Sequence, residues 1–171
     1  MNTTADIAPI GRSLEEAYRH VQNTRMRNLP IVNPALRVEA IGLRAWDGLC
    51  FGVIVTPWCM NVVALPLPGG RELPPTQAGS TRAMDLPTGS YDLLAAHLPQ
   101  VGHHLSGSLY SPMDAFTSQE QAVAAARDAL ALMFDAAPSR PDPAGLSDPQ
   151  PGAAPEDIGS RRSFLLGRAS R

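Results

Sequence analysis

Between residues 36 and 110 the chain consists of short apolar segments joined mostly by turns of a few residues, and this spacing constrains the fold more than any other feature. In several of these segments apolar residues recur at every second position, which is the pattern of β-strands. Parallel strands need crossover connections of a dozen or more residues, whereas antiparallel strands can be joined by tight turns. The sequence therefore predicts a mainly antiparallel sheet of about six strands.

The predicted strands are bounded by recognisable turn residues. Asp47-Gly48 is typical of a type I′ hairpin, because both residues tolerate a positive φ. Around Gly42 the alternation changes phase, as a β-bulge would produce. The segment 49–55 is apolar on both faces, which indicates a central strand covered on each side. The predicted strands are residues 36–45, 49–55, 60–65, 80–85, 90–97 and 103–110.

Two capping boxes mark helix starts on either side of the predicted sheet. Ser13-Leu14-Glu15-Glu16 and Thr117-Ser118-Gln119-Glu120 each place a hydroxyl three residues before a carboxylate, so each can satisfy backbone N–H groups of a first helical turn. The first helix is predicted to end near Arg27, before Leu29-Pro30, and the second before Pro138. The predicted fold class is α+β, an antiparallel sheet flanked by an N-terminal and a C-terminal helix.

The predicted organisation is one domain with two tails. A flexible N-terminus of residues 1–12 precedes a single α+β domain of residues 13–134. Residues 135–160 hold many prolines, five acids and one arginine, with almost no large apolar side chain, so burial cannot offset the entropy lost on ordering. We predict a disordered, proline-rich, acidic linker there. Residues 161–171 form a basic tail with four arginines and no acid.

Composition and charge argue against several function classes. The formal net charge is −2, so the chain lacks the basic footprint of a nucleic-acid-binding protein. No apolar run reaches the roughly 18–20 residues of a membrane span, and the N-terminus does not resemble a signal peptide. The two cysteines, Cys50 and Cys59, form neither a disulfide framework nor a structural zinc motif. We expect a cytoplasmic protein with reduced thiols and with no metal or cofactor.

No catalytic constellation is apparent in the sequence, so an enzyme is not expected. His103 and His104 are adjacent on a predicted strand, where side chains point to opposite faces, and they cannot converge on one metal ion. Neither a GxSxG nucleophile elbow nor a phosphate-binding loop occurs. Nothing near Cys59 in the sequence would lower the pKa of its thiol.

Two clusters at predicted strand ends combine aromatic, thioether and proline residues. Such residues most often belong to a core or a turn, but together they can form an apolar groove that accepts a peptide of a partner protein. Two alternatives stay open: a carrier of a small ligand or cofactor with a groove at Trp58 and Met60, and a thiol-dependent enzyme with an exposed, acidic Cys59. The predicted protein-binding residues are Thr56, Pro57, Trp58, Met60, Asn61, Ser108, Leu109, Ser111, Pro112 and Met113.

The basic tail contains a twin-arginine phrase at the opposite end of the chain from an export signal. The segment Ser160-Arg161-Arg162-Ser163-Phe164-Leu165-Leu166 reads like the start of such a signal. It is followed by far fewer apolar residues than the roughly 7–15 that a signal needs, so it cannot direct export. We interpret the phrase as a mimic of signals in other proteins, with Arg161, Arg162, Phe164 and Leu165 as the mimic residues.

Four short motifs occur in an order that resembles one known family. The chain is similar to the HybE/HupJ/HoxT family of [NiFe]-hydrogenase assembly chaperones over residues 14–134 and at its C-terminal tip. The resemblance implies a cytoplasmic, non-enzymatic maturation chaperone for an uptake hydrogenase, including proofreading of twin-arginine signals. The motifs are Val55-Thr56-Pro57-Trp58-Cys59-Met60-Asn61, Leu86-Pro87-Thr88-Gly89, Ser108-Leu109-Tyr110-Ser111-Pro112-Met113 and Arg161-Arg162-Ser163-Phe164-Leu165.

The resemblance also implies partners. The expected client is the precursor of the hydrogenase small subunit, which carries an N-terminal twin-arginine signal, and the large subunit and a rubredoxin-like protein are further expected partners. We predict that the tail of this chain competes with the client signal for the groove. Members of the family often have cysteine just before the Ser-Leu-x-Ser-Pro motif, whereas this chain has Gly107. A thiol role at that position is therefore not carried over.

Overall fold

The computed structural model describes residues 6–135, so the predicted linker beyond Asp135 and the basic tail lie outside the described residues. The six strands form one sheet in the order β1-β2-β3-β6-β5-β4, and all neighbouring strands are antiparallel. The predicted α+β fold is confirmed. The elements are α1 (Ala8–Thr24), β1 (Glu39–Trp46), β2 (Leu49–Val55), β3 (Met60–Pro66), β4 (Thr81–Leu86), β5 (Gly89–Leu98), β6 (Gly102–Tyr110) and α2 (Gln119–Phe134).

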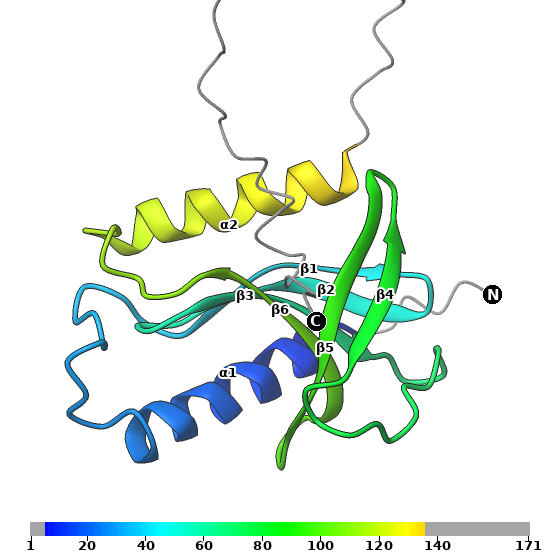
Figure 1. Ribbon diagram of the computed structural model, residues 1–171, viewed down its shortest axis with the longest axis horizontal. Helices are drawn as coiled ribbons and strands as arrows, with labels where there is room; N and C mark the ends of the chain where they lie inside the picture. The colour runs from blue at the N-terminus through cyan, green and yellow to red at the C-terminus, as the bar shows by residue number, and fades with distance from the viewer. Residues whose placement is uncertain (1–5, 136–171) are drawn as a thin grey trace, which may run out of the picture.

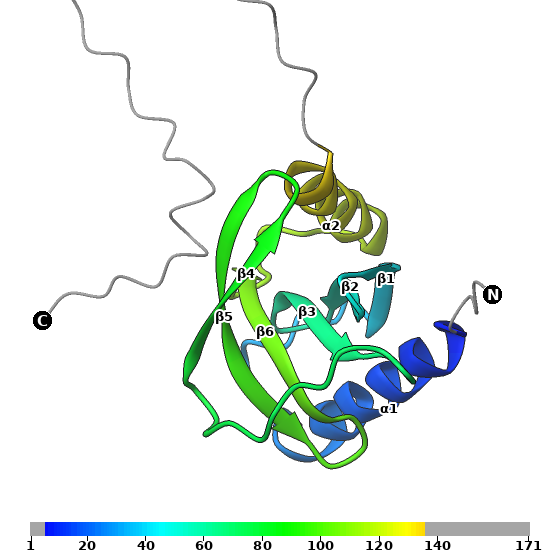
Figure 2. The ribbon, with the colours of Figure 1, turned by 90° about the vertical axis from the view of Figure 1, so that its right-hand side faces the viewer.

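The two helices lie on opposite sides of the sheet (Figure 1). Figure 2 shows α1 beneath β1, β2 and β3, while β4 and β5 curve up toward α2 on the other side. The helices therefore cover different parts of the sheet. The face of β1–β3 that looks toward α1 is covered by that helix, whereas the same face of β4 and β5 lies away from it.

The central strand β2 separates two hydrophobic clusters, and all seven of its residues are buried. Phe51 and Val53 belong to the cluster that α2 covers. Cys50 and Ile54 belong to the cluster that α1 covers. This alternation is what a strand with both faces covered requires. The prediction that both faces of residues 49–55 are covered is confirmed, and the strand lies second from the edge of the sheet.

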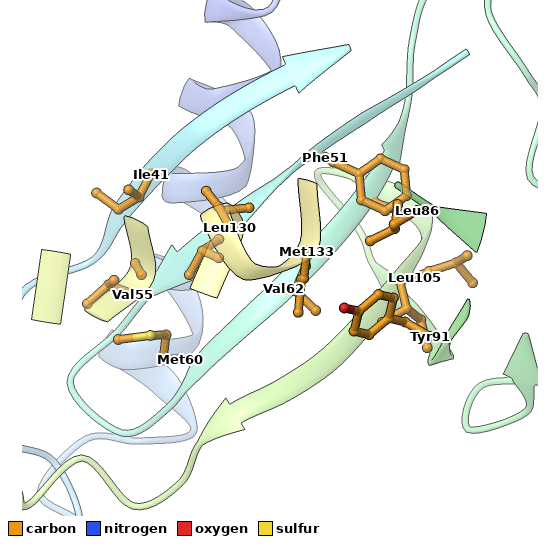
Figure 3. Packing of buried hydrophobic residues seen from close by; sticks show 14 of the residues in the cluster. Ile41, Phe51, Val55, Met60, Val62, Leu86, Tyr91, Leu105, Leu130 and Met133 are labelled. Atoms are coloured by element: carbon orange, nitrogen blue, oxygen red, sulfur yellow. The ribbon is translucent and has the colours of Figure 1, made fainter. Parts of the chain in front are cut away.

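The larger cluster fills the space between the sheet and α2. Leu130 and Met133 of α2 lie over Val55, Met60 and Val62 of β2 and β3 (Figure 3). Met60 has no exposed surface, and Leu130 and Val62 have almost none. Burial of such side chains stabilises the fold by about 1.5–3 kcal/mol each.

The two edge strands of the sheet meet near the C-terminal end of α2. The indole Nε1 of Trp46 in β1 donates a hydrogen bond of 3.3 Å to the backbone oxygen of Asp85 in β4. The same indole contacts the ring of Phe134 edge-on, with ring centroids 5.7 Å apart. The sheet therefore curls until its first and last strands are bridged by one side chain.

The Leu86-Pro87-Thr88-Gly89 motif forms the turn between β4 and β5 and binds the end of α2. The Thr88 hydroxyl donates a hydrogen bond of 2.8 Å to the backbone oxygen of Met133, and its oxygen lies 2.7 Å from the Tyr91 hydroxyl. The backbone N–H of Thr88 donates to the same Met133 oxygen at 3.3 Å. The last carbonyls of a helix lack partners within the helix. This motif therefore supplies hydrogen-bond donors to a backbone carbonyl at the C-terminus of α2.

Replacing Thr88 with valine keeps the shape of the side chain but removes the contacts of its hydroxyl with Met133 and Tyr91. We expect the free energy of unfolding to fall by about 1–2 kcal/mol, because the Met133 carbonyl and the Tyr91 hydroxyl each lose a partner. Urea unfolding followed by circular dichroism measures this change. Thr81→Val, at an exposed position of β4, is the matched control. An equal effect of the two substitutions on the free energy of unfolding would contradict this role of Thr88.

The first helix begins earlier than predicted, at Ala8 instead of Ser13. Pro9 occupies one of its first two positions, where the missing N–H of proline costs nothing. The predicted capping residues Ser13 and Glu16 therefore lie inside the helix, and the adjacent Glu15 accepts, at its Oε1, a hydrogen bond of 3.0 Å from the backbone N–H of Ala40 in β1. The prediction of a flexible segment up to residue 12 is therefore wrong for residues 8–12. The helix also ends at Thr24, before the predicted Arg27.

The local features predicted around β1 are present. The register of β1 against β2 shifts between Ile41 and Arg44, which confirms the bulge, and Gly42 has a φ of +62°. Asp47 and Gly48 both have positive φ values, of 48° and 72°, which confirms the predicted hairpin turn. The strand starts later than predicted, at Glu39 instead of residue 36.

Candidate functional site

β3 and β6 place the two predicted clusters side by side, and the strands then sort their residues onto opposite faces. Asn61 lies directly opposite Ser108, and Met60 lies opposite Tyr110. Met60 and Met113 are completely buried in the cluster under α2. The prediction that these two methionines contact a partner is therefore wrong, because they form part of the core.

Trp58 lies on the other side of the sheet from Met60. It is half-buried and packs against the cluster that α1 covers, whereas Met60 belongs to the cluster that α2 covers. The predicted groove lined by Trp58 and Met60 together is therefore wrong, and with it the site proposed for a small-ligand carrier. A separate hollow of about 200 Å³ lies beside α2 and is lined by Arg37, Gln119, Glu120, Val123, Ala124 and Arg127.

Thr56 organises the turn that presents Trp58. Its hydroxyl donates a hydrogen bond of 2.8 Å to the backbone oxygen of Cys59 and accepts from the N–H groups of Cys59 and Trp58 at 2.9 and 3.3 Å. Thr56 is completely buried and Pro57 is also buried, so the prediction that they contact a partner directly is wrong. These residues hold Trp58 in place.

Asn33 joins three loops at one end of the sheet, a role that the sequence analysis missed. Its Nδ2 donates hydrogen bonds to the backbone oxygens of Met113 at 3.1 Å and Phe116 at 2.8 Å. Its backbone N–H donates to Pro57 at 2.8 Å. The exposed Ser111 and Pro112 belong to one of these loops. The only signal in the sequence is Asn33-Pro34, which also occurs in ordinary turns.

A surface that the sequence analysis did not identify lies on the uncovered side of β4, β5 and β6. Leu94 of β5 lies directly between Thr81 of β4 and Ser106 of β6 in the sheet register. Side chains on the other side of β4 and β5, such as Met84 and Leu93, are buried under α2. This surface, named the open face, consists of Thr81, Ala83, Asp85, Asp92, Leu94, Ser106 and Ser108, all exposed or half-buried.

Tyr18 of α1 marks the border between the covered sheet and the open face. Its ring stacks on Trp58 with centroids 6.4 Å apart. Burial, with a smaller contribution from Cys59, raises the pKa of Tyr18 to about 12, while side-chain hydrogen bonds with Asn61 and Ser106 act in the opposite direction. The phenol is therefore neutral at physiological pH. Three of the predicted residues, Trp58, Asn61 and Ser108, lie on or beside the open face.

The open face is acidic and partly apolar. Asp85 and Asp92 are the charged side chains at its positions, and the ion pairs in residues 6–135 are Glu15–Arg19, Glu39–Arg37 and Asp47–Arg71, so neither aspartate is paired with a cation there. Leu94 exposes 49% of its surface. Unpaired carboxylates beside an exposed leucine suit a ligand that combines cationic and apolar side chains.

Neither cysteine is activated as a nucleophile. Burial raises the pKa of Cys50 to about 11. Burial also raises the pKa of Cys59, although a hydrogen bond with Thr56 partly offsets this. A reactive thiol needs a lowered pKa, so these shifts oppose the thiol-dependent alternative.

The histidines are separated as the strand alternation predicts. His103 faces His97 across β5 and β6, with ring centroids 4.8 Å apart. His104 points to the other side, where burial lowers its pKa and its Nδ1 lies 3.0 Å from the Gly102 oxygen. No cluster of three or more potential metal-ligating residues occurs in residues 6–135. None of the helices in this part of the chain is long and apolar enough to span a membrane.

The open face combines carboxylates with an exposed leucine, and such a surface suits a segment of another polypeptide. A profile described as "[NiFe]-hydrogenase assembly, chaperone, HybE" matches residues 10–167. The chain therefore belongs to the HybE family of [NiFe]-hydrogenase assembly chaperones, and the resemblance inferred from its motifs is confirmed.

Similar proteins share most of the length of the chain. The hydrogenase expression/formation protein HoxT of Azotobacter vinelandii is 40% identical over 134 residues, covering 78% of this chain and 86% of HoxT. HupJ of Bradyrhizobium diazoefficiens, with the same description, is 38% identical over 166 residues, covering 97% of this chain and 92% of HupJ. The solution structure of HybE from Escherichia coli has the same fold, with a TM-score of 0.61 and 23% identity over 95% of this chain and 91% of HybE.

Proposed function

We propose that this chaperone binds the twin-arginine signal of a [NiFe]-hydrogenase small-subunit precursor on its open face, in the cytoplasm and before export. The observation that carries the proposal is a pair of carboxylates, Asp85 and Asp92, that have no ion-pair partner within residues 6–135 and lie on the same face as the exposed Leu94. A twin-arginine signal combines adjacent arginines with an apolar segment. The protein acts by holding the precursor and makes or breaks no bond in it.

The spacing of the two aspartates fits adjacent arginines. Asp92 lies opposite Ala83 in the register, and Asp85 is two residues further along β4. Such diagonal neighbours lie about 7–8 Å apart across a sheet. Both carboxylates are thus within reach of the long side chains of two consecutive arginines, and arginine forms strong charge-assisted hydrogen bonds with carboxylates.

The remaining residues of the open face supply apolar and polar contacts. Leu94 offers apolar surface for the hydrophobic residues that follow the arginines in the signal, and the half-buried Trp58 adds apolar surface beside Tyr18 at the border of the open face. The hydroxyls of Ser106 and Ser108 and the amide of Asn61 lie close by on adjacent strands, where they can bind the backbone of an extended peptide. The site is therefore matched to the whole signal phrase.

The test measures binding of a labelled small-subunit signal peptide to the full-length chain by fluorescence anisotropy. We expect D85N/D92N to weaken binding about 10-fold, since partly exposed ion pairs contribute up to about 1 kcal/mol each. A peptide with lysines in place of both arginines should also bind more weakly, because lysine cannot form the same forked hydrogen bonds.

Asp114→Asn is the matched control, because Asp114 is an exposed acid in the loop after β6 and lies off the open face. Equal affinities of D114N and D85N/D92N would show that the open face does not bind the signal.

Further partners follow from the family. We propose that the chaperone also meets the hydrogenase large subunit and a rubredoxin-like protein during assembly. One relative, named "Probable rubredoxin HupJ" in Rhodobacter capsulatus, is 35% identical over 119 residues, which is 70% of this chain and 42% of that relative. That likeness supports a rubredoxin-like partner for this chain.

A further inference from the structure

We infer that the twin-arginine phrase of the C-terminal tail, residues 161–166, docks on the open face of its own chain and competes there with the client signal. The inference rests on the proposed function, because both ligands would occupy the same surface. The tail is the occupant that the chain itself supplies, since Arg161, Arg162, Phe164 and Leu165 repeat the order of cationic and apolar residues in a twin-arginine signal.

The place where the chain leaves the domain favours this contact. α2 ends at Phe134, and the turn before β5 binds its last residues through the hydrogen bond from Thr88 to Met133. Asp92 and Leu94 lie four and six residues beyond Thr88, which is about 13 and 20 Å along an extended strand. The described part of the chain therefore ends near one end of the open face.

The intervening segment is long enough to reach across this distance. Residues 136–160 separate the end of the described chain from Arg161. A flexible chain of 25 residues has a root-mean-square span of about 25–30 Å, and a proline-rich one extends further. The effective concentration of a tethered ligand is greatest when this span is close to the distance to its site.

The charge of the open face favours binding of the tail over binding of the segment that precedes it. The twin-arginine phrase, residues 161–166, carries two adjacent arginines and no acid, whereas residues 135–160 carry five acids and one arginine. The open face holds Asp85 and Asp92, so it attracts the tail and repels the preceding segment. The distribution of charge thus selects which part of the C-terminal segment binds.

Docking of the tail would set a minimum affinity that a client signal needs in order to bind. A short tether gives an effective concentration of about 1 mM. If the tail alone had a dissociation constant of about 10 μM, it would lower the apparent affinity of an external signal about 100-fold. Weak ligands would be rejected, and a precursor that makes further contacts with the domain would still displace the tail.

The experiment compares full-length chains that differ only in the tail. We expect R161Q/R162Q to bind the small-subunit signal peptide 10- to 100-fold more tightly than the unmodified chain, because the competitor is removed. R168Q/R171Q is the matched control, since it removes the same charge outside the mimic phrase and should change the affinity less than about 3-fold.

A second measurement detects docking without any client. We expect the backbone amide signals of Asp92, Leu94 and Ser108 in nuclear magnetic resonance spectra to shift between the unmodified chain and R161Q/R162Q, and to stay in place in R168Q/R171Q. Unchanged amide signals together with unchanged peptide affinity would overturn tail docking and leave the proposed function intact. Shifted signals in a chain that binds no signal peptide would support docking and overturn the proposed function.

Discussion

Replacing Leu94 with lysine is expected to weaken binding of a twin-arginine signal peptide at least 30-fold. Leu94 is half-exposed at the centre of the open face, so the substitution removes apolar contact area that the signal would bury. The new ammonium group also lies near Asp92 and repels the incoming arginines. The two effects together amount to about 2–3 kcal/mol, and each 1.4 kcal/mol is a tenfold change in affinity.

The fold itself should tolerate this substitution. Surface changes away from caps and buried networks usually alter the free energy of unfolding by no more than about 0.5 kcal/mol. Leu132→Lys is the matched control, because Leu132 is similarly exposed, at 54%, but lies on α2. Peptide anisotropy with both variants, also in the R161Q/R162Q chain, separates loss of the site from competition by the tail. Equal binding by L94K and L132K would place the signal elsewhere on the molecule.

Phe51→Ala is expected to lower the free energy of unfolding by about 3–5 kcal/mol. Phe51 has no exposed surface and belongs to the cluster between the sheet and α2 (Figure 3). Its ring meets that of Phe134 edge-on, with centroids 5.8 Å apart. Truncation removes the transfer free energy of the ring and leaves a cavity that neighbouring strands cannot fill.

Urea unfolding of the full-length chain, followed by circular dichroism, measures this loss. Phe51→Leu fills part of the cavity and should cost clearly less than Phe51→Ala. Leu132→Ala on the exposed side of α2 should change the stability by no more than about 0.5 kcal/mol. A loss below about 1 kcal/mol for Phe51→Ala would mean that β2 and α2 do not pack as described.

The motifs that revealed the family serve different purposes in the structure. Thr88 binds the end of α2, and Thr56 builds the turn that presents Trp58. Both hydroxyls therefore support the scaffold. Asp92 and Leu94, which belong to none of the motifs, supply the charge and the apolar surface of the open face. A motif in the sequence thus indicated the family more directly than it indicated the binding surface.

The sequence alone was sufficient for the features that depend on neighbouring residues. The bulge at Gly42, the Asp47-Gly48 turn and the buried strand β2 were predicted correctly, because each follows from local conformational preference or from a period of two. The start of α1 was predicted wrongly because it depends on tertiary packing and not on neighbouring residues alone. The Ser13 capping box is a valid local signal, but the packing of α1 on the sheet extends the helix back to Ala8.

Only the tertiary structure decided which side of each strand is covered. A period of two shows which residues share a face, but it does not show which face a helix will cover. The pairing of β6 with both β3 and β5 aligns Ser106 with Leu94, and α1 reaches Ser106 through Tyr18 but leaves Leu94 exposed. The same pairing places the side chain of Met60 in the core under α2. The open face therefore depends on contacts between residues far apart in the chain, whose pairing the local pattern does not specify.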